Sequence, residues 1–193
     1  LNDAIIKPLA EAIAGEKIDF LLVSGDLASG WFKNGGTGYE AQYANWREAM
    51  RPVYEAGIRV YPIRGNHDDG PERLVLPPLK PELEPPPGSQ ARMKRAFLAA
   101  FPETYIPGDG PAGEERLTYA FTHKNALVVG LDQYANGQHK VSQDWLDRAL
   151  RGAGGRHVFA YGHEPAFETN HKDNLACFPE ERDRFWDGLG AAG

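Results

Sequence analysis

Three short apolar segments of this 193-residue chain each run into a glycine that is followed by polar side chains. Residues 18–23 precede Ser24-Gly25-Asp26, residues 58–63 precede Gly65-Asn66-His67-Asp68, and residues 158–161 precede Gly162-His163-Glu164-Pro165. Apolar runs of this length, bounded by turn residues, favour buried strands. Ligands bind at the carboxyl ends of strands in open α/β sheets. The sequence therefore predicts an α/β fold with a site at a shared sheet edge.

The segments around these strands complete the predicted fold. Apolar residues spaced three and four apart predict a helix over residues 2–14. A second helix over residues 39–56 lies between the first two strands, and this β-α-β order favours a parallel pair. Further along the chain we expect a helix at 91–101, a hairpin of strands at 117–121 and 126–131, a helix that starts at Ser142 as N-cap, and a helix at 180–189.

Composition limits the function classes. A length of 193 residues favours a single domain over residues 1–193. The net charge of −6 argues against nucleic-acid binding, because a phosphate backbone needs a basic stripe on the protein. No apolar segment approaches the roughly 20 residues of a membrane helix. An acidic protein can still bind anionic phosphoesters when metal ions reverse the local field.

Proline dominates residues 71–90, which we expect to be a loop insertion. Such a segment can be neither regular helix nor central strand. Its position directly after Gly65-Asn66-His67-Asp68 fits a lid over the site, and a surface loop without a role fits equally well.

Asp26, Asn66 and His163 are the candidate metal ligands. Together they offer a carboxylate oxygen, an amide oxygen and an imidazole nitrogen, which suit Mn²⁺, Fe²⁺, Zn²⁺ or Mg²⁺. Each has a structural alternative: Asp26 as a turn or helix cap, residues 66–70 as a polar turn, and His163 as an ordinary loop residue. A histidine adds nothing to a turn, however, and the same strand context occurs three times, which favours a functional site.

These three motifs, in this order and after predicted strands, resemble the middle three of five motifs in calcineurin-like metallophosphoesterases. The resemblance implies a four-layer α/β/β/α sandwich, here incomplete at both ends, around two divalent metal ions. It also implies phosphoester hydrolysis by metal-bound hydroxide. Asp26 would bridge the metals, and Asn66 and His163 would bind the second one. His67 would contact the phosphoryl group with Asn66 and protonate the leaving oxygen. His171 lies shortly after His163 in the sequence. It is expected either to line the substrate cleft or to be a solvated loop histidine.

The sequence also departs from the family pattern. It contains no Asp-x-His and no Gly-His-x-His, which in the family supply most ligands of the first metal. We therefore interpret the chain as a truncated domain that binds metal weakly and turns over poorly. Ser29 stands where many members carry a second acid that orients the catalytic histidine. Asp68 and Asp69 are the candidates to replace it.

Several questions stay open at this level. A protein-binding module on the same fold, with a degraded metal site, is the alternative to an enzyme. The substrate is a small-molecule or protein phosphoester. Residues 131–134 and 142–146 resemble the corresponding segment of secreted-type bacterial members of the family. This resemblance implies a periplasmic or secreted location. The remaining expectations are surface or turn positions for His123, His139 and His157, and helix packing anchors at Trp46, Trp145 and Trp186.

Overall fold

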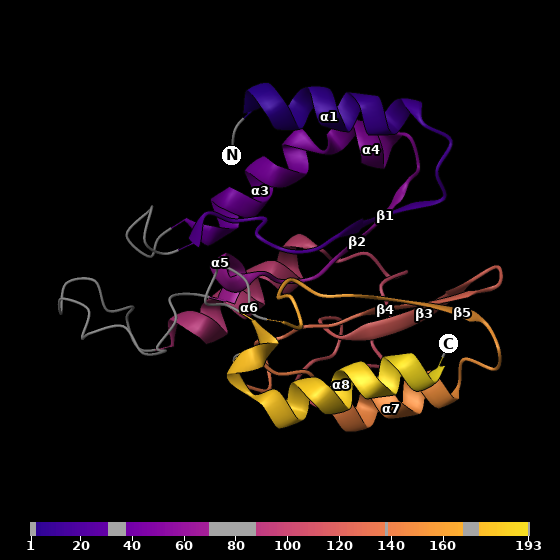
Figure 1. Cartoon of the computed structure of the whole chain (residues 1–193). Coiled ribbons are helices and arrows are strands. Elements are labelled where there is room, and N and C mark those ends of the chain that lie inside the picture. The colour runs from indigo at the N-terminus through magenta and orange to yellow at the C-terminus, as the bar shows by residue number, and fades with distance from the viewer. Residues whose placement is uncertain (1–2, 31–37, 70–87, 138, 168–173, 193) are drawn as a thin grey trace. The chain divides into compact units, whose positions relative to one another are not determined.

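The computed structural model of the chain describes residues 3–30, 38–69, 88–137, 139–167 and 174–192 (Figure 1). The chain divides into two compact units, Leu1–Glu103 and Thr104–Gly193. Each unit combines a β-sheet with helices, so the predicted mixed α/β composition is confirmed.

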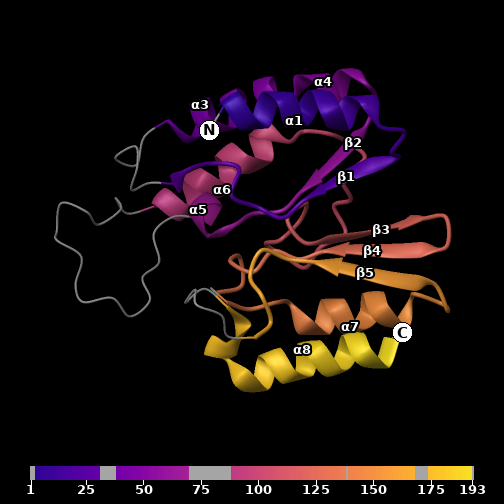
Figure 2. The ribbon, with the colours of Figure 1, turned by 45° about the horizontal axis from the view of Figure 1, so that its top comes forward.

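The sheet of unit 1 consists of β1 (Phe20–Val23) and β2 (Arg59–Pro62). They pair in parallel, with Phe20 opposite Arg59 and Val23 opposite Pro62, as the β-α-β order predicted. The chain passes between them through α3 (Tyr39–Ala49) and α4 (Arg51–Glu55), and α1 (Asp3–Gly15) precedes β1. Because parallel strands end at the same sheet edge, the segments after Val23 and Pro62 emerge side by side (Figure 2).

The helix expected over residues 39–56 is broken into two. Met50, at φ −90° and ψ 5°, ends α3 by donating its N–H to the Trp46 carbonyl at 2.9 Å. Pro52, which lies in the first turn of α4, has no N–H to continue the helical ladder. A proline is tolerated there because the first N–H groups of a helix lack partners anyway.

Aromatic rings hold α6 (Ser89–Ala100) against α3. Tyr43 packs edge-on against Phe97 at 5.8 Å between centroids, and Trp46 packs against Phe101 at 5.6 Å. Trp46 is thus the packing anchor that the sequence predicted. Helix α6 begins two residues before its expected start at residue 91, and residues 70–87 of the expected loop insertion 71–90 lie outside the described part of the chain. A lid function for them stays a prediction.

Unit 2 has a sheet of three strands in the order β3 (Tyr119–His123), β4 (Ala126–Gly130), β5 (His157–Tyr161). The first pair is the predicted antiparallel hairpin, and β5 joins β4 in parallel. Helices α7 (Gln143–Arg151) and α8 (Pro179–Ala192) lie next to each other on one side of this sheet (Figures 1 and 2). A short 3-10 helix, η2 (Leu175–Cys177), precedes α8. The core between sheet and helices includes Val129, Leu131, Trp145, Leu146, Leu175 and Phe185.

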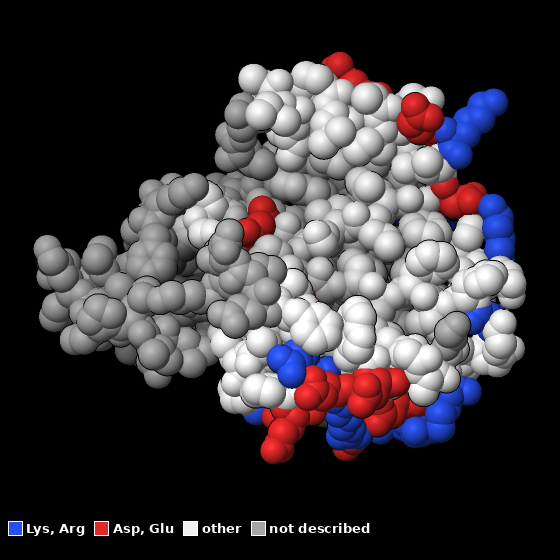
Figure 3. Space-filling model, in the orientation of Figure 1, with Lys and Arg blue, Asp and Glu red and all other residues white. Residues whose placement is uncertain are grey.

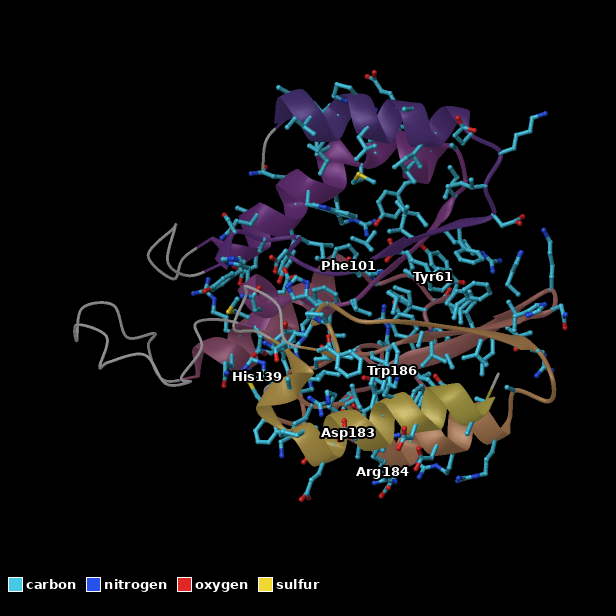
Figure 4. The ribbon with its side chains drawn as sticks, viewed as in Figure 1. Tyr61, Phe101, His139, Asp183, Arg184 and Trp186 are labelled. Atoms are coloured by element: carbon cyan, nitrogen blue, oxygen red, sulfur yellow. The ribbon has the colours of Figure 1, made fainter. Side chains whose placement is uncertain are left out.

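The expectation about Trp186 of α8 is wrong, and the one about Ser142 of α7 is confirmed for its position. Trp186 is no packing anchor: it is 52% exposed and meets Phe167 edge-on at 5.1 Å (Figure 4). Ser142 does occupy the N-cap position of α7, but its side chain makes no cap hydrogen bond. Its hydroxyl donates to the Glu114 carboxylate instead, and a charge-assisted bond of this kind is stronger than a neutral cap.

Charged side chains on α8 are largely paired with the opposite sign. Arg184 contacts Asp144 and Asp147 at 2.7 and 2.6 Å, and Lys140 contacts Glu181 at 2.9 Å. Acidic and basic atoms are accordingly mixed over this helix on the face drawn in Figure 3. In the described part of the chain, no helix is both long and apolar enough to cross a membrane.

Candidate active site

The segments that follow β1 and β2 touch backbone to backbone. Gly25 has φ +100°, and a Cβ built on it would lie 2.5 Å from the Gly65 nitrogen. Only glycine allows this approach in this conformation. Asp26 follows at φ +57°, a left-handed conformation that aspartate tolerates better than most residues. This contact between glycines sets Asp26 beside the residues after Gly65.

Asp26 meets the start of α5 (Asn66–Asp69). Its Oδ1 accepts a hydrogen bond from the His67 backbone N–H at 3.2 Å. Asp26 therefore makes a hydrogen bond of the kind that its structural alternative, a helix cap, would make. A carboxylate offers about four acceptor sites, so a cap bond is compatible with cation binding. The Asp26 side chain is exposed, whereas Asn66 and His67 are half-buried.

Asp68 is fully buried and ties the two segments together. Its Oδ2 accepts the N–H groups of Leu27 at 3.2 Å and Gly65 at 2.9 Å. Its Oδ1 accepts the Ala28 N–H at 3.0 Å and the Tyr43 hydroxyl at 3.1 Å. The hypothesis that Asp68 orients the His67 imidazole is wrong, because its carboxylate binds the backbone of both loops instead.

Burial raises the pKa of the Asp68 carboxyl to about 6, and the charge of Asp26 adds to this rise. Hydrogen bonds from Gly65, Ala28 and Leu27 oppose it by stabilising the ionised form. Burial also raises the pKa of Tyr43 well above its ordinary value, and the Asp68 carboxylate raises it further. Tyr43 therefore stays protonated and donates to Asp68.

Asp69 and Ser29 also have partners other than the imidazole. Asp69 forms a buried ion pair with Arg64 at 2.7 Å and accepts from Gln90 at 3.2 Å. Ser29 donates both its backbone N–H, at 2.8 Å, and its hydroxyl, at 3.0 Å, to Gln42. The backbone of Gly30 instead lies against His67, since a Cβ at Gly30 would come 2.8 Å from Nδ1 of the ring.

His163 follows β5 in unit 2, where it is half-buried. Its backbone N–H donates to Oε1 of Gln133 at 2.7 Å, and its ring lies 6.4 Å from that of Tyr134. Of the two positions predicted for His139, the turn is confirmed and the surface is wrong. His139 is 2% exposed, and its Nδ1 contacts both carboxylate oxygens of Glu164 at 2.9 Å (Figure 4). Its neighbours in the sequence look like a polar turn, and the partner that buries it is 25 residues away.

The structure thus brings Asp26, Asn66 and His67 together at the sheet edge of unit 1, and it places His163 in the loop after β5 of unit 2. His171 lies outside the described residues. Among the residues that are described, no three His, Cys, Asp or Glu side chains form a group that could hold a metal ion. The expected ligand set differs from such a group, because one of its three members is the amide of Asn66. Its mixture of oxygen and nitrogen donors fits borderline or hard divalent ions.

Sequence reasoning missed Gln133, His139 and Glu164, and it gave Asp68 the wrong role. No local signal marks the first three, because their contacts join segments that are 25 to 31 residues apart. The spacing of Asp68 from Gly65 did carry a signal, since a side chain of this kind commonly bonds a nearby backbone N–H in a turn.

Comparison with known proteins identifies the family and the fold of the chain. A family model described as calcineurin-like phosphoesterase matches residues 2–186. The chain is also similar to a solved structure titled "Structure of PhoD", with a TM-score of 0.69 and 14% identity over 97% of this chain and 46% of that one. This chain therefore spans less than half of the PhoD chain, and the low identity supports the fold alone. Among curated proteins, none matches significantly. The fold is of the metallophosphoesterase type, and the chain belongs to the calcineurin-like phosphoesterase family.

Proposed function

We propose that this domain hydrolyses phosphoesters with the help of two divalent metal ions, in the native polypeptide that contains it. Membership of a phosphoesterase family that is generally metal-dependent supports the reaction class. The observation that carries the proposal is the contact of Gly25 with Gly65, which places Asp26 beside Asn66 and His67 at the ends of two parallel strands.

Asp26, Asn66 and His163 are the residues that would hold the metals. Bound divalent cations of this kind stabilise charge on phosphoryl oxygens and lower the pKa of water. The mixed donors admit Mn²⁺, Fe²⁺, Zn²⁺ and Mg²⁺. The cap bond from the His67 N–H to Asp26 Oδ1 supports the role of Asp26, because it fixes the carboxylate at the sheet edge.

His67 would move the proton. A neutral leaving alcohol forms only if a positioned acid protonates the departing oxygen, and this step is commonly worth about 10²- to 10⁴-fold in rate. The Gly30 backbone lies against the Nδ1 side of the imidazole, which restricts how the ring turns. The Asn66 amide can donate to a phosphoryl oxygen. The substrate is a small-molecule or protein phosphoester, and His171 is proposed to line its cleft.

The test compares His67→Ala with Asp26→Asn in the longest native polypeptide that contains these residues. With Mn²⁺ present, hydrolysis of p-nitrophenyl phosphate and bis-p-nitrophenyl phosphate is measured beside Mn²⁺ affinity. His67→Ala should lower kcat by about 10²-fold or more and leave Mn²⁺ affinity nearly unchanged, since its role is proton transfer. Asp26→Asn should weaken Mn²⁺ binding and lower activity together.

His157→Ala serves as the matched control, because His157 is exposed at the start of β5. It should keep wild-type values for both readouts. A His67→Ala variant that turns over aryl phosphates at the wild-type rate would refute the proton-transfer role. Absence of both hydrolysis and Mn²⁺ binding in the wild type would favour a protein-binding module on this fold.

A further inference from the structure

The side-chain amide of Gln133 forms hydrogen bonds with the backbone of the loop that carries His163. Gln133 lies three residues beyond β4 and is 2% exposed. Its Oε1 accepts the N–H groups of His163 and Glu164, each at 2.7 Å, and its Nε2 donates to the Glu164 carbonyl at 3.1 Å. One amide group therefore satisfies three backbone groups of two consecutive residues.

The Gln133 amide also packs closely against Gly162, the residue before the histidine. A Cβ built on Gly162 would lie 2.9 Å from Oε1 of Gln133 and 3.1 Å from its amide carbon. Any side chain at residue 162 would push the amide away from the loop. The strands add to this registration, because the Leu131 N–H donates to the Tyr161 carbonyl at 3.0 Å.

Gln133 is itself held in place from its own side. Asp132 Oδ1 accepts the N–H groups of Tyr134 at 3.0 Å and Ala135 at 2.7 Å, which closes a tight turn around Gln133. The Asp132 N–H donates to Thr118, whose hydroxyl donates to the buried Glu114 carboxylate. The amide thus projects from a segment with little freedom.

The far side of the loop is fixed by a buried pair. The Glu164 carboxylate is fully buried against Nδ1 of His139 at 2.9 Å. Beyond it, the Pro165 carbonyl accepts the Leu175 N–H at 3.0 Å. The backbone at His163 is therefore held on one side by Gln133 and on the other through Glu164.

We propose that Gln133 is a positioning residue that sets the backbone of His163, and hence the direction of its imidazole, for metal binding. The inference rests on the proposed function, in which His163 is a metal ligand. A histidine ligand binds well only if its ring is fixed before the metal arrives, and loss of an orienting partner typically costs about 10- to 100-fold in metal affinity. Gln133 makes no metal contact in this proposal and acts only through the loop.

The decisive variant is Gln133→Met, which keeps side-chain length and removes the amide. Mn²⁺ affinity is measured by titration calorimetry in the longest native polypeptide, at a temperature where circular dichroism shows the metal-free variant to be fully folded. We expect affinity to fall about 10- to 100-fold. Wild-type affinity in the folded variant would overturn the proposal.

Three further variants make the outcome unambiguous. Gln143→Met is the matched control, because Gln143 is a half-buried amide of unit 2 that donates to Asp147. This variant should bind Mn²⁺ as the wild type does.

If Gln133→Met does not fold, Gln133→Glu takes its place: it keeps an acceptor for the two N–H groups and loses the donor to the Glu164 carbonyl. Weaker binding than wild type supports the proposal, and equal binding overturns it. His163→Ala separates the two hypotheses, since unchanged Mn²⁺ binding there refutes the ligand assignment itself.

Discussion

At the scale of single residues, the site of unit 1 depends on the Asp68 carboxylate, whose hydrogen bonds go to backbone N–H groups and to a tyrosine hydroxyl. Asp68 accepts three backbone N–H groups and one hydroxyl, and these donors come from the segment after β1, the segment after β2, and α3. Such a group has the greatest effect where it is buried, because each donor that loses it stays unsatisfied. Asp68 thereby fixes the backbone directly after Asp26 and the backbone directly before Asn66.

The isosteric change Asp68→Asn tests this role. Each carboxylate oxygen accepts two donors, so an amide NH₂ in either orientation faces at least one backbone N–H that it cannot satisfy. We expect the free energy of unfolding at pH 7 to fall by about 2–3 kcal/mol, measured by urea denaturation. Glu11→Gln, an exposed carboxylate of α1, is the control and should change it by less than about 0.5 kcal/mol. An Asp68→Asn variant with an unchanged free energy of unfolding would contradict the structural role of Asp68.

Residue identity explains why part of the site was predictable. Gly65-Asn66-His67-Asp68 is a local pattern, and its histidine has no purpose in a turn, so sequence alone indicated chemistry there. The partners of Asp68 and Gln133 are up to 41 and 31 residues away, and no spacing rule connects them. Sequence therefore identified candidate ligands and missed the residues that hold them.

At the scale of elements, a buried ion pair connects the end of β2 to α5 and α6. Arg64 and Asp69 are almost completely buried and lie 2.7 Å apart, and Gln90 of α6 donates to Asp69 at 3.2 Å. Removal of one partner of a buried pair leaves the other charge uncompensated, which costs more than the pair itself contributes. The pair thus ties the short helix α5, which carries Asn66 and His67, to its surroundings.

Arg64→Met should therefore lower the free energy of unfolding by about 3–5 kcal/mol in denaturant melts. Arg95→Met on the exposed face of α6 is the matched control and should be nearly neutral. In the double variant Arg64→Met with Asp69→Leu, we expect much of the loss to be recovered, because no lone charge stays buried. A double variant as unstable as the sum of its single changes would show that the pair is not coupled.

Elements were easier to predict than their boundaries. Apolar runs predicted the strands, the β-α-β order predicted the parallel pair β1–β2, and two apolar runs around a short turn predicted the hairpin β3–β4. The break at Met50 was missed although Pro52 gave a signal for it, since proline inside a helical pattern ends or kinks the helix. The hydroxyl of Ser142 was expected to cap α7, but a distant buried carboxylate, Glu114, binds it instead.

At the scale of the whole molecule, the expected ligands come from both units. Asp26 and Asn66 follow strands of unit 1, and His163 follows a strand of unit 2, each after a glycine at the carboxyl end. The order of motifs along the chain predicted the family, and the family model confirms it over residues 2–186. Composition alone could not do this, because an acidic soluble-type composition is common to many folds.

The number of ligands sets how tightly this chain can bind metal by itself. The sequence holds no Asp-x-His and no Gly-His-x-His, so the proposed assignment names three ligands, Asp26, Asn66 and His163, for two metals. We expect the 193-residue chain to bind Mn²⁺ with a dissociation constant above about 10 μM. This value corresponds to a binding free energy weaker than about −7 kcal/mol. The reason is that metal affinity rises with the number of ligands and with their preorganisation. Calorimetric titration of the metal-stripped chain measures this, and Asp26→Asn should remove the remaining heat. Two tight Mn²⁺ sites on the chain would show that other side chains complete the centre, and the assignment of Asp26, Asn66 and His163 as its principal ligands would then be wrong.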